Sequence, residues 1–188
     1  MKRKNAFTLV EILTAITIIA VLAGISLGVS RLVMTKAHEA KNKAVVKMIE
    51  VAMEQYKNKY GYYPNSGTGS KPFYMDRVDL SASPDATRDI RKNMWQFFDE
   101  KFKNAYVRGD ISNGEGYVVD ALGNPLIYRC PGKFNTDSFD LGSAGEDGKL
   151  GDGGTAIRTP SNATGISNAD YEKFGEGDDV VNFKNNEQ

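Results

Sequence analysis

A long apolar run close to the N-terminus constrains this chain more than any other feature. Residues 5–30 contain a single charged side chain, Glu11, and residues 2–4 immediately before the run are Lys-Arg-Lys. The run is longer than the ~20 residues that a helix needs to cross a bilayer. Because basic residues stay on the cytoplasmic side, the pattern predicts one membrane-spanning helix with residues 1–4 inside and the C-terminus outside.

The length of this run separates it from a secretory signal peptide, whose apolar core of roughly 7–15 residues precedes a small-x-small cleavage site. An anchor helix fits the length better, although a charge inside such a helix is costly and usually marks function. Glu11 lies only one turn inside the run, so its carboxylate could instead reach the membrane interface. The residues alone support both interpretations of Glu11 equally.

The string at residues 6–11, Ala-Phe-Thr-Leu-Val-Glu, resembles the class III signal of type IV prepilins and pseudopilins. The resemblance implies that a membrane prepilin peptidase removes a leader of residues 1–6 by cutting just before Phe7. It also implies that the same enzyme methylates the new N-terminus. Residues 7–30 are then retained as a transmembrane helix that forms the filament core.

Two positions depart from this family pattern. Ala6 stands before the cut, where the family usually has Gly, and Gly28 stands where the family commonly has Pro. Alanine is the next smallest residue, so processing after Ala6 is expected. Gly28 either loosens the helix, as Pro would, or combines with Gly24 to let neighbouring helices pack closely.

The family resemblance also gives Glu11 a role in filament assembly. It implies that Glu11 of one subunit pairs with the new amine of Phe7 in a neighbouring subunit of a helical homopolymer. The physical reason is that a carboxylate and an ammonium group buried in an apolar core each need a partner. Such a pair would set the axial register between subunits.

Residues 31–188 are expected to form a periplasmic globular domain that begins with a helix over 31–61. Apolar side chains recur there mostly every three or four residues, which is typical of one buried helix face. The stripe consists of Ala37, Ala44, Met48, Ala52 and Tyr56, widened by Val45 and Ile49. Gly61 and Pro64 predict the end of the helix.

The resemblance implies that the following region, residues 62–115, is the variable part of a pilin-like protein. Its polar stretch at 65–82 predicts a loop. Ser83 as an N-cap, Pro84 at the first helical position and an apolar stripe predict a second helix over 84–105.

Three short β-type segments follow within residues 116–143. Residues 116–119, 126–129 and 139–143 read as strands separated by Gly and Pro turns. They predict a small antiparallel meander, one face of which the long helix can cover. The expected fold is therefore α+β and pilin-like, with a long N-terminal helix on a small antiparallel sheet, a second helix and a long C-terminal loop.

The C-terminal part of the chain is acidic and rich in glycine. Residues 137–188 contain eleven Asp and Glu against four Lys and Arg, together with nine of the 19 glycines. Composition alone supports either disorder or a loop that binds a cation.

Motifs in the sheet and the tail sharpen the resemblance toward the major pseudopilins of type II secretion. These motifs are Asp120, Gly123, Pro125, Tyr128 and Pro131-Gly132, the run 139–148, and residues 177–183. That family binds Ca²⁺ in the final loop, here residues 144–188. The resemblance implies that the ligands are the carboxylates of Asp147, Asp152, Asp178 and Asp179 and the backbone carbonyl of Ala144.

Several classes of function are excluded by the composition. One histidine, His38, rules out a His-based catalytic triad or a multi-His metal site within one chain, and one cysteine, Cys130, rules out an internal disulfide. No nucleophile motif or cofactor loop is present, so the chain is not expected to be an enzyme. Its 24 basic and 24 acidic residues give no support for a nucleic-acid partner.

The resemblance implies a structural subunit of a type II secretion pseudopilus that polymerises through its N-terminal helix and helps to drive folded proteins across the outer membrane. Its expected partners are copies of itself, minor pseudopilins, the prepilin peptidase, the inner-membrane assembly platform and, before assembly, membrane lipid. The expected location is the bacterial inner membrane with the C-terminus in the periplasm, and then a periplasm-spanning filament. The alternative is a major or minor type IV pilin of a surface filament.

Overall fold

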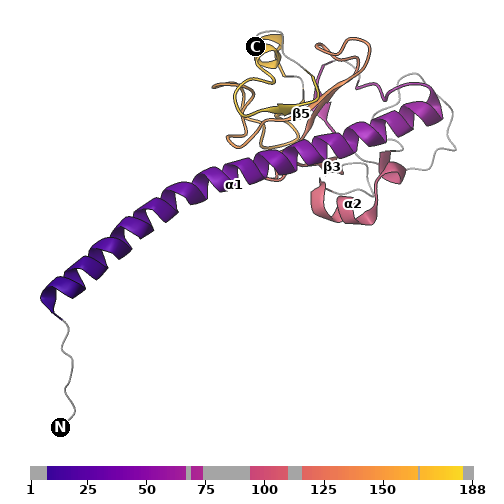
Figure 1. Cartoon of the computed structure of the whole chain (residues 1–188). Coiled ribbons are helices and arrows are strands. Elements are labelled where there is room, and N and C mark those ends of the chain that lie inside the picture. The colour runs from indigo at the N-terminus through magenta and orange to yellow at the C-terminus, as the bar shows by residue number, and fades with distance from the viewer. Residues whose placement is uncertain (1–7, 67–68, 74–93, 110–115, 165, 184–188) are drawn as a thin grey trace. The chain divides into compact units, whose positions relative to one another are not determined.

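The computed structural model has two compact units, residues 1–37 and 38–188, and their boundary falls within the first helix. The residues whose structure is described are 8–66, 69–73, 94–109, 116–164 and 166–183, with the side chains of 26–32 left out (Figure 1).

The first unit contains the N-terminal part of α1 (Leu9–Tyr60). Its large apolar side chains from Leu9 to Ile25 are 49–81% exposed. Within the described part of the chain, no helix is long and apolar enough to cross a membrane. The span predicted over 7–30 includes Phe7 and the side chains of 26–30, which lie outside the described set.

The second unit contains the rest of α1, which buries one face. Val45, Ile49, Ala52 and Tyr56 are buried and recur every three or four residues, and Met53 beside them is also buried, as expected for a helix packed on one side. The predicted stripe is slightly misplaced around the helix, because Ala44 and Met48 are exposed.

The helix α1 ends where the sequence predicts. Gly61 follows Tyr60 with a positive φ of 84°, and its N–H donates to the carbonyl of Lys57 at 2.7 Å. Glycine adopts this left-handed conformation without the steric cost that other residues incur.

The main sheet of the second unit has four antiparallel strands in the order β1-β4-β5-β6. They are β1 (Lys71–Pro72), β4 (Ile127–Arg129), β5 (Asp140–Ser143) and β6 (Val180–Val181). Gly142 lies at its centre, opposite Ile127 on one side and Val181 on the other. Two further strands, β2 (Val107–Arg108) and β3 (Tyr117–Val118), form a separate antiparallel pair.

The predicted three-stranded meander is therefore partly wrong. β4 and β5 pair as expected, but β3 pairs with β2, and β1 occupies the edge of β4 that was assigned to β3. The contact between the first two predicted strands is reduced to a single bridge from Val119 to Pro125. Beyond this bridge, the Val118 N–H donates to the carbonyl of Phe73 at 2.8 Å, and the Phe73 N–H donates to the carbonyl of Leu126 at 2.9 Å. Phe73, the residue after β1, therefore takes the hydrogen bonds that would extend the ladder between the two predicted strands.

The predicted second helix is also corrected. Within the described residues, the structure has a 3₁₀ turn η1 (Met94–Phe97) and a short helix α2 (Glu100–Tyr106). Asp99 separates them because its carboxylate accepts the N–H of Phe102 at 2.6 Å and so starts a new helix. Residues 84–93 of the prediction lie outside the described residues. A third helix, α3 (Asn168–Glu172), was not predicted.

Two hydrophobic clusters fill the second unit. In the first, the buried face of α1 packs with side chains from the sheet and from the segment that contains α2. Its members include Phe73, Phe98, Phe102, Val118, Leu126, Tyr128 and Leu141. Figure 1 shows the sheet around β5 and the helix α2 on different sides of this part of α1.

A polar contact fixes α1 to the sheet. Asn42 is buried on α1; its Nδ2 donates to Ser143 Oγ at 3.2 Å, and its Oδ1 accepts the N–H of Ala121 at 2.9 Å. Ser143 Oγ in turn donates to Asp120 Oδ2 at 2.6 Å. One buried amide therefore connects the helix, the end of β5 and the turn that follows β3.

We expect Asn42→Ala to lower the free energy of unfolding by about 1–3 kcal/mol, because it removes the acceptor of the Ala121 N–H and one of the donors to Ser143 Oγ. Urea unfolding of the full chain in detergent, followed by Trp95 fluorescence, measures the loss. Asn58→Ala, an exposed position on the same helix, is the matched control. Equal losses in the two variants would show that the buried amide has no special role.

Candidate functional site

The first candidate site lies at the start of α1. Glu11 Oε2 accepts the N–H and the hydroxyl of Thr8, both at 2.8 Å, and Thr8 Oγ1 accepts the N–H of Glu11 at 3.2 Å. This reciprocal arrangement is a capping box, in which an N-cap Thr and a Glu three residues later satisfy free helix N–H groups. The Thr-x-x-Glu spacing is the sequence signal for this cap, which was not among the predictions.

Capping gives Glu11 a role within its own chain, besides any contact with a neighbouring subunit. The predicted processing residues Ala6 and Phe7 lie outside the described residues. The structure therefore supplies the local geometry of Glu11 and leaves the cleavage site and the intersubunit pair as predictions.

The second candidate site is the acidic loop that follows β5. Asp178 is exposed, yet its Oδ2 accepts the backbone N–H groups of Glu146 and Asp147, the latter at 3.1 Å. Gly145, at a φ of 61°, lies against this carboxylate, and a Cβ there would be 2.5 Å from the Asp178 carboxyl carbon. The close approach requires glycine, so the start and end of the loop are held together at this point.

Among the described acidic side chains of the loop, Asp179 has the most strongly shifted pKa. Its Oδ2 accepts the N–H groups of Gly151 at 2.9 Å and Gly175 at 3.0 Å, while its Oδ1 is buried without a hydrogen-bond partner. Burial raises the pKa of Asp179 to about 7, with smaller upward contributions from the charges of Asp178 and Asp147, against the opposing effect of the two N–H donors. An unpartnered buried carboxylate oxygen can accept a proton or a cation.

The other predicted calcium ligands are less enclosed. Asp147 is exposed, and its Oδ1 accepts the N–H of Lys149 at 2.7 Å. Asp152 is also exposed, and a Cβ on Gly177 would lie 3.0 Å from its Oδ1. Ala144 is fully buried at the end of β5.

The donor chemistry of this loop suits Ca²⁺, which prefers carboxylate and carbonyl oxygens. The orphaned Oδ1 of Asp179 is the atom best placed to bind a cation. The predicted set is nevertheless not gathered into one cluster, because no group of three or more His, Cys, Asp or Glu side chains that could hold a metal occurs among the described residues. Asp179 therefore suits a calcium ligand, whereas the other predicted carboxylates are not gathered around one position.

Two buried carboxylates have structural roles that the sequence analysis did not assign. Asp140 is fully buried and accepts the N–H groups of Lys133, Phe134 and Asn135 and the hydroxyl of Tyr171. Asp120 accepts the N–H groups of its own turn and the Ser143 hydroxyl. The sequence could have indicated these roles, because Asp120 and Asp140 both lie in the motifs that resemble type II secretion major pseudopilins.

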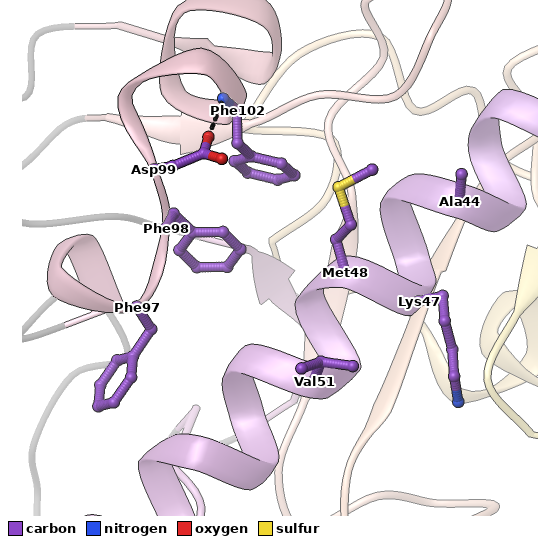
Figure 2. A pocket seen from close by; sticks show the side chains of 8 residues that line it. All are labelled: Ala44, Lys47, Met48, Val51, Phe97, Phe98, Asp99 and Phe102. Atoms are coloured by element: carbon purple, nitrogen blue, oxygen red, sulfur yellow. Dashed lines mark hydrogen bonds between the residues drawn. The ribbon is translucent and has the colours of Figure 1, made fainter.

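A separate apolar hollow of about 490 Å³ lies between α1 and the segment from Phe97 to Phe102 (Figure 2). Met48 and Val51 line it on the helix side. Asp99 is its one carboxylate, and that group is already engaged in capping α2. The hollow therefore offers packing surface rather than a reactive group.

Comparison with known families identifies the chain. A family model described as the prokaryotic N-terminal methylation motif matches residues 1–27, and one described as type II secretion system (T2SS), protein G, matches residues 32–159. The chain belongs to the T2SS protein G family. This result confirms the predicted family and the pilin-like α+β fold class.

Two T2SS protein G relatives cover most of the chain. The type II secretion system core protein G of Escherichia coli K12 is 30% identical over 79% of this chain and 86% of its own length. The protein of the same name from Pseudomonas aeruginosa PAO1 is 29% identical over 80% of this chain and 89% of its own length. No solved structure matches the chain. The protein G match ends at residue 159, before α3 and β6.

The raised pKa of Asp179 predicts a pH-dependent effect of Asp179→Asn. An unfolded Asp ionises near pH 3.9, whereas folded Asp179 holds its proton up to about pH 7. The folded wild type therefore loses stability as the pH rises through this window, by up to about 4 kcal/mol. Asn carries no charge, so the variant should gain stability relative to wild type between pH 5 and pH 8.

Urea unfolding at both pH values in EGTA measures this difference. Asp137→Asn, a change of the same kind at an exposed position, is the control and should track the wild type. A constant offset between Asp179→Asn and wild type would contradict the assignment of a raised pKa to Asp179.

Proposed function

We propose that this chain is a structural subunit of a type II secretion pseudopilus and polymerises through its N-terminal helix to help drive protein export across the outer membrane. The observation that carries this proposal is the succession of two family matches along one chain, an N-terminal methylation motif followed by protein G. Such a subunit acts by assembly, and its function requires no covalent chemistry.

Processing and anchoring are part of the proposal. A prepilin peptidase cuts between Ala6 and Phe7 and methylates Phe7, and the chain is held in the inner membrane with its C-terminus in the periplasm. The N-terminal methylation motif supports this processing. The proposed partners are further copies of the chain, minor pseudopilins and the inner-membrane assembly platform.

In the assembled filament, the Glu11 carboxylate accepts the amine of Phe7 from a neighbouring subunit. The exposed apolar side chains of the first unit, from Leu9 to Ile25, supply surface that assembly can bury. A charge inside such a packed region needs a partner, and the new amine of Phe7 is a suitable one. Pairing of Glu11 with Thr8 in the single chain keeps the carboxylate at the helix start.

We further propose that the loop of residues 144–188 binds Ca²⁺ through Asp179 Oδ1, with Asp147, Asp152, Asp178 and the Ala144 carbonyl completing the ligand set. The buried, unpartnered oxygen of Asp179 supports this assignment. The bound cation would neutralise the loop carboxylates, whose mutual repulsion contributes to the raised pKa of Asp179.

Glu11→Gln separates the two roles of Glu11. Gln can still form the capping box with Thr8, but it cannot pair as an ion with the amine of Phe7. Because an unpaired buried charge costs about 3–5 kcal/mol, we expect filament yield to fall by at least about 100-fold. Sedimentation of sheared filaments from cells with the secretion machinery measures the yield, and mass spectrometry confirms cleavage before Phe7.

Glu39→Gln, at a solvent-facing ion pair with Lys43 farther along α1, is the control and should assemble normally. Normal assembly of Glu11→Gln would mean that Glu11 serves only as a helix cap. An uncleaved, unmethylated chain that still polymerised would argue against the prepilin part of the proposal.

Calcium binding predicts a rise in thermal stability of the full chain in detergent. A ligand at 100 times its dissociation constant adds about 2.7 kcal/mol to the folded state. We expect Ca²⁺ to raise the Tm by several degrees and Asp179→Asn to remove most of the rise. Asp137→Asn is the control with an unchanged response. A wild type without any rise would remove calcium from the proposal and leave the filament role intact.

A further inference from the structure

The part of α1 in the second unit presents a second apolar stripe beside the buried one. Ala40, Ala44, Met48 and Val51 recur every three or four residues, and all four are exposed. Met48 is 47% exposed and Val51 is 49% exposed. The described part of one chain therefore leaves an apolar helix surface uncovered, which a helix facing only water would cover with polar side chains.

This second stripe accounts for the misplaced prediction on α1. The apolar periodicity predicted that Ala44 and Met48 are buried, whereas both are exposed in the single chain. Apolar periodicity marks the faces that a helix buries, and such a face can be buried against its own chain or against another. The two residues therefore indicate a face of α1 that another protein surface covers.

The exposed stripe forms one wall of the apolar hollow described above (Figure 2). Met48 and Val51 lie on the helix side, and Figure 2 shows the rings of Phe98 and Phe102 across from Met48. The hollow has a volume of about 490 Å³, which is within the range of pockets that take up a drug-sized group. It is therefore large enough to receive apolar side chains from a partner.

The polar side chains at the hollow already have partners within the chain. Lys47 Nζ lies 2.7 Å from Glu50 Oε2 in an ion pair, and the Asp99 carboxylate accepts the N–H of Phe102 at 2.6 Å. A charged or strongly polar ligand would have to compete with these contacts. The lining therefore favours an apolar occupant.

A complementary apolar surface lies at the start of α1. The large apolar side chains from Leu9 to Ile25 are exposed, and Glu11 is the one charged residue among residues 9–25. This segment cannot fill the hollow of its own chain, because α1 is a continuous helix and side chains on one helix contact each other only three or four residues apart. The same segment of a second copy has no such restriction.

We infer that the hollow between α1 and the segment Phe97–Phe102 receives the apolar N-terminal helix, residues 9–25, of a second copy of this chain in the filament. An apolar helix face in an apolar groove is a common mode of protein recognition. The contact buries Met48 and Val51 together with part of the exposed helix start. This inference rests on the proposed function, and it adds a docking surface in the second unit to the pairing of Glu11 with Phe7.

Met48→Lys tests this docking surface in cells with the secretion machinery. The new ammonium group has no partner in an apolar contact, so we expect the yield of sedimented filaments to fall by at least about 10-fold. The monomer in detergent should keep the wild-type Tm, because Met48 is exposed in the single chain. Where it does not, Met48→Gln replaces this variant. Asn58→Lys, at an exposed position of the same helix outside the hollow, is the matched control and should assemble normally.

Photo-cross-linking identifies the occupant of the hollow. The photoreactive residue p-benzoylphenylalanine takes the place of Met48, or of Val51 where the first variant does not assemble. Filaments should give a cross-linked dimer, and mass spectrometry should map the second site to residues 9–25. The monomer in detergent should give no dimer.

The outcomes separate this inference from the proposed function. Normal filament yield from Met48→Lys would overturn the inference alone, as would a cross-link to any other segment of either chain. A wild type that forms no filaments would overturn the proposed function and this inference with it.

Discussion

Burial of one face of α1 is the constraint on which the rest of the second unit depends. Ile49, Met53 and Tyr56 are at most 1% exposed, and a buried side chain of this size contributes about 1.5–3 kcal/mol. Packing alone would tolerate some rotation of the helix. Asn42 removes that freedom, because a rotated helix would break its hydrogen bonds to Ser143 and Ala121. The helix is thus held by apolar contact and oriented by one amide.

Carboxylates organise the loops around this frame. Asp120, Asp140, Asp178 and Asp179 each accept backbone N–H groups that no strand or helix satisfies. Buried or crowded N–H groups need such acceptors, so three acidic residues of the tail, Asp140, Asp178 and Asp179, have a structural role before any cation is considered. Asp179 differs from the other three in having a buried oxygen without a hydrogen-bond partner, which explains why the calcium proposal centres on it.

The two units of the chain suit two tasks. The first presents apolar side chains on a helix that starts with a capping box at Thr8 and Glu11, as a polymerising subunit requires. The second builds a compact domain from two hydrophobic clusters. Most members of the first cluster lie within the protein G match, and four members of the second, Ala163, Tyr171, Phe174 and Phe183, follow position 159, where that match ends.

The sequence by itself determined the family, the end of α1 at Gly61 and the pairing of β4 with β5, because local motifs and periodicity encode them. It also fixed Glu11 near the helix start, although the Thr-x-x-Glu cap was overlooked. Only the tertiary structure decided that β1 replaces β3 beside β4, and that Phe174 covers Gly142. These contacts join residues far apart in sequence, and strand order and burial depend on which distant segments compete for the same edge or face.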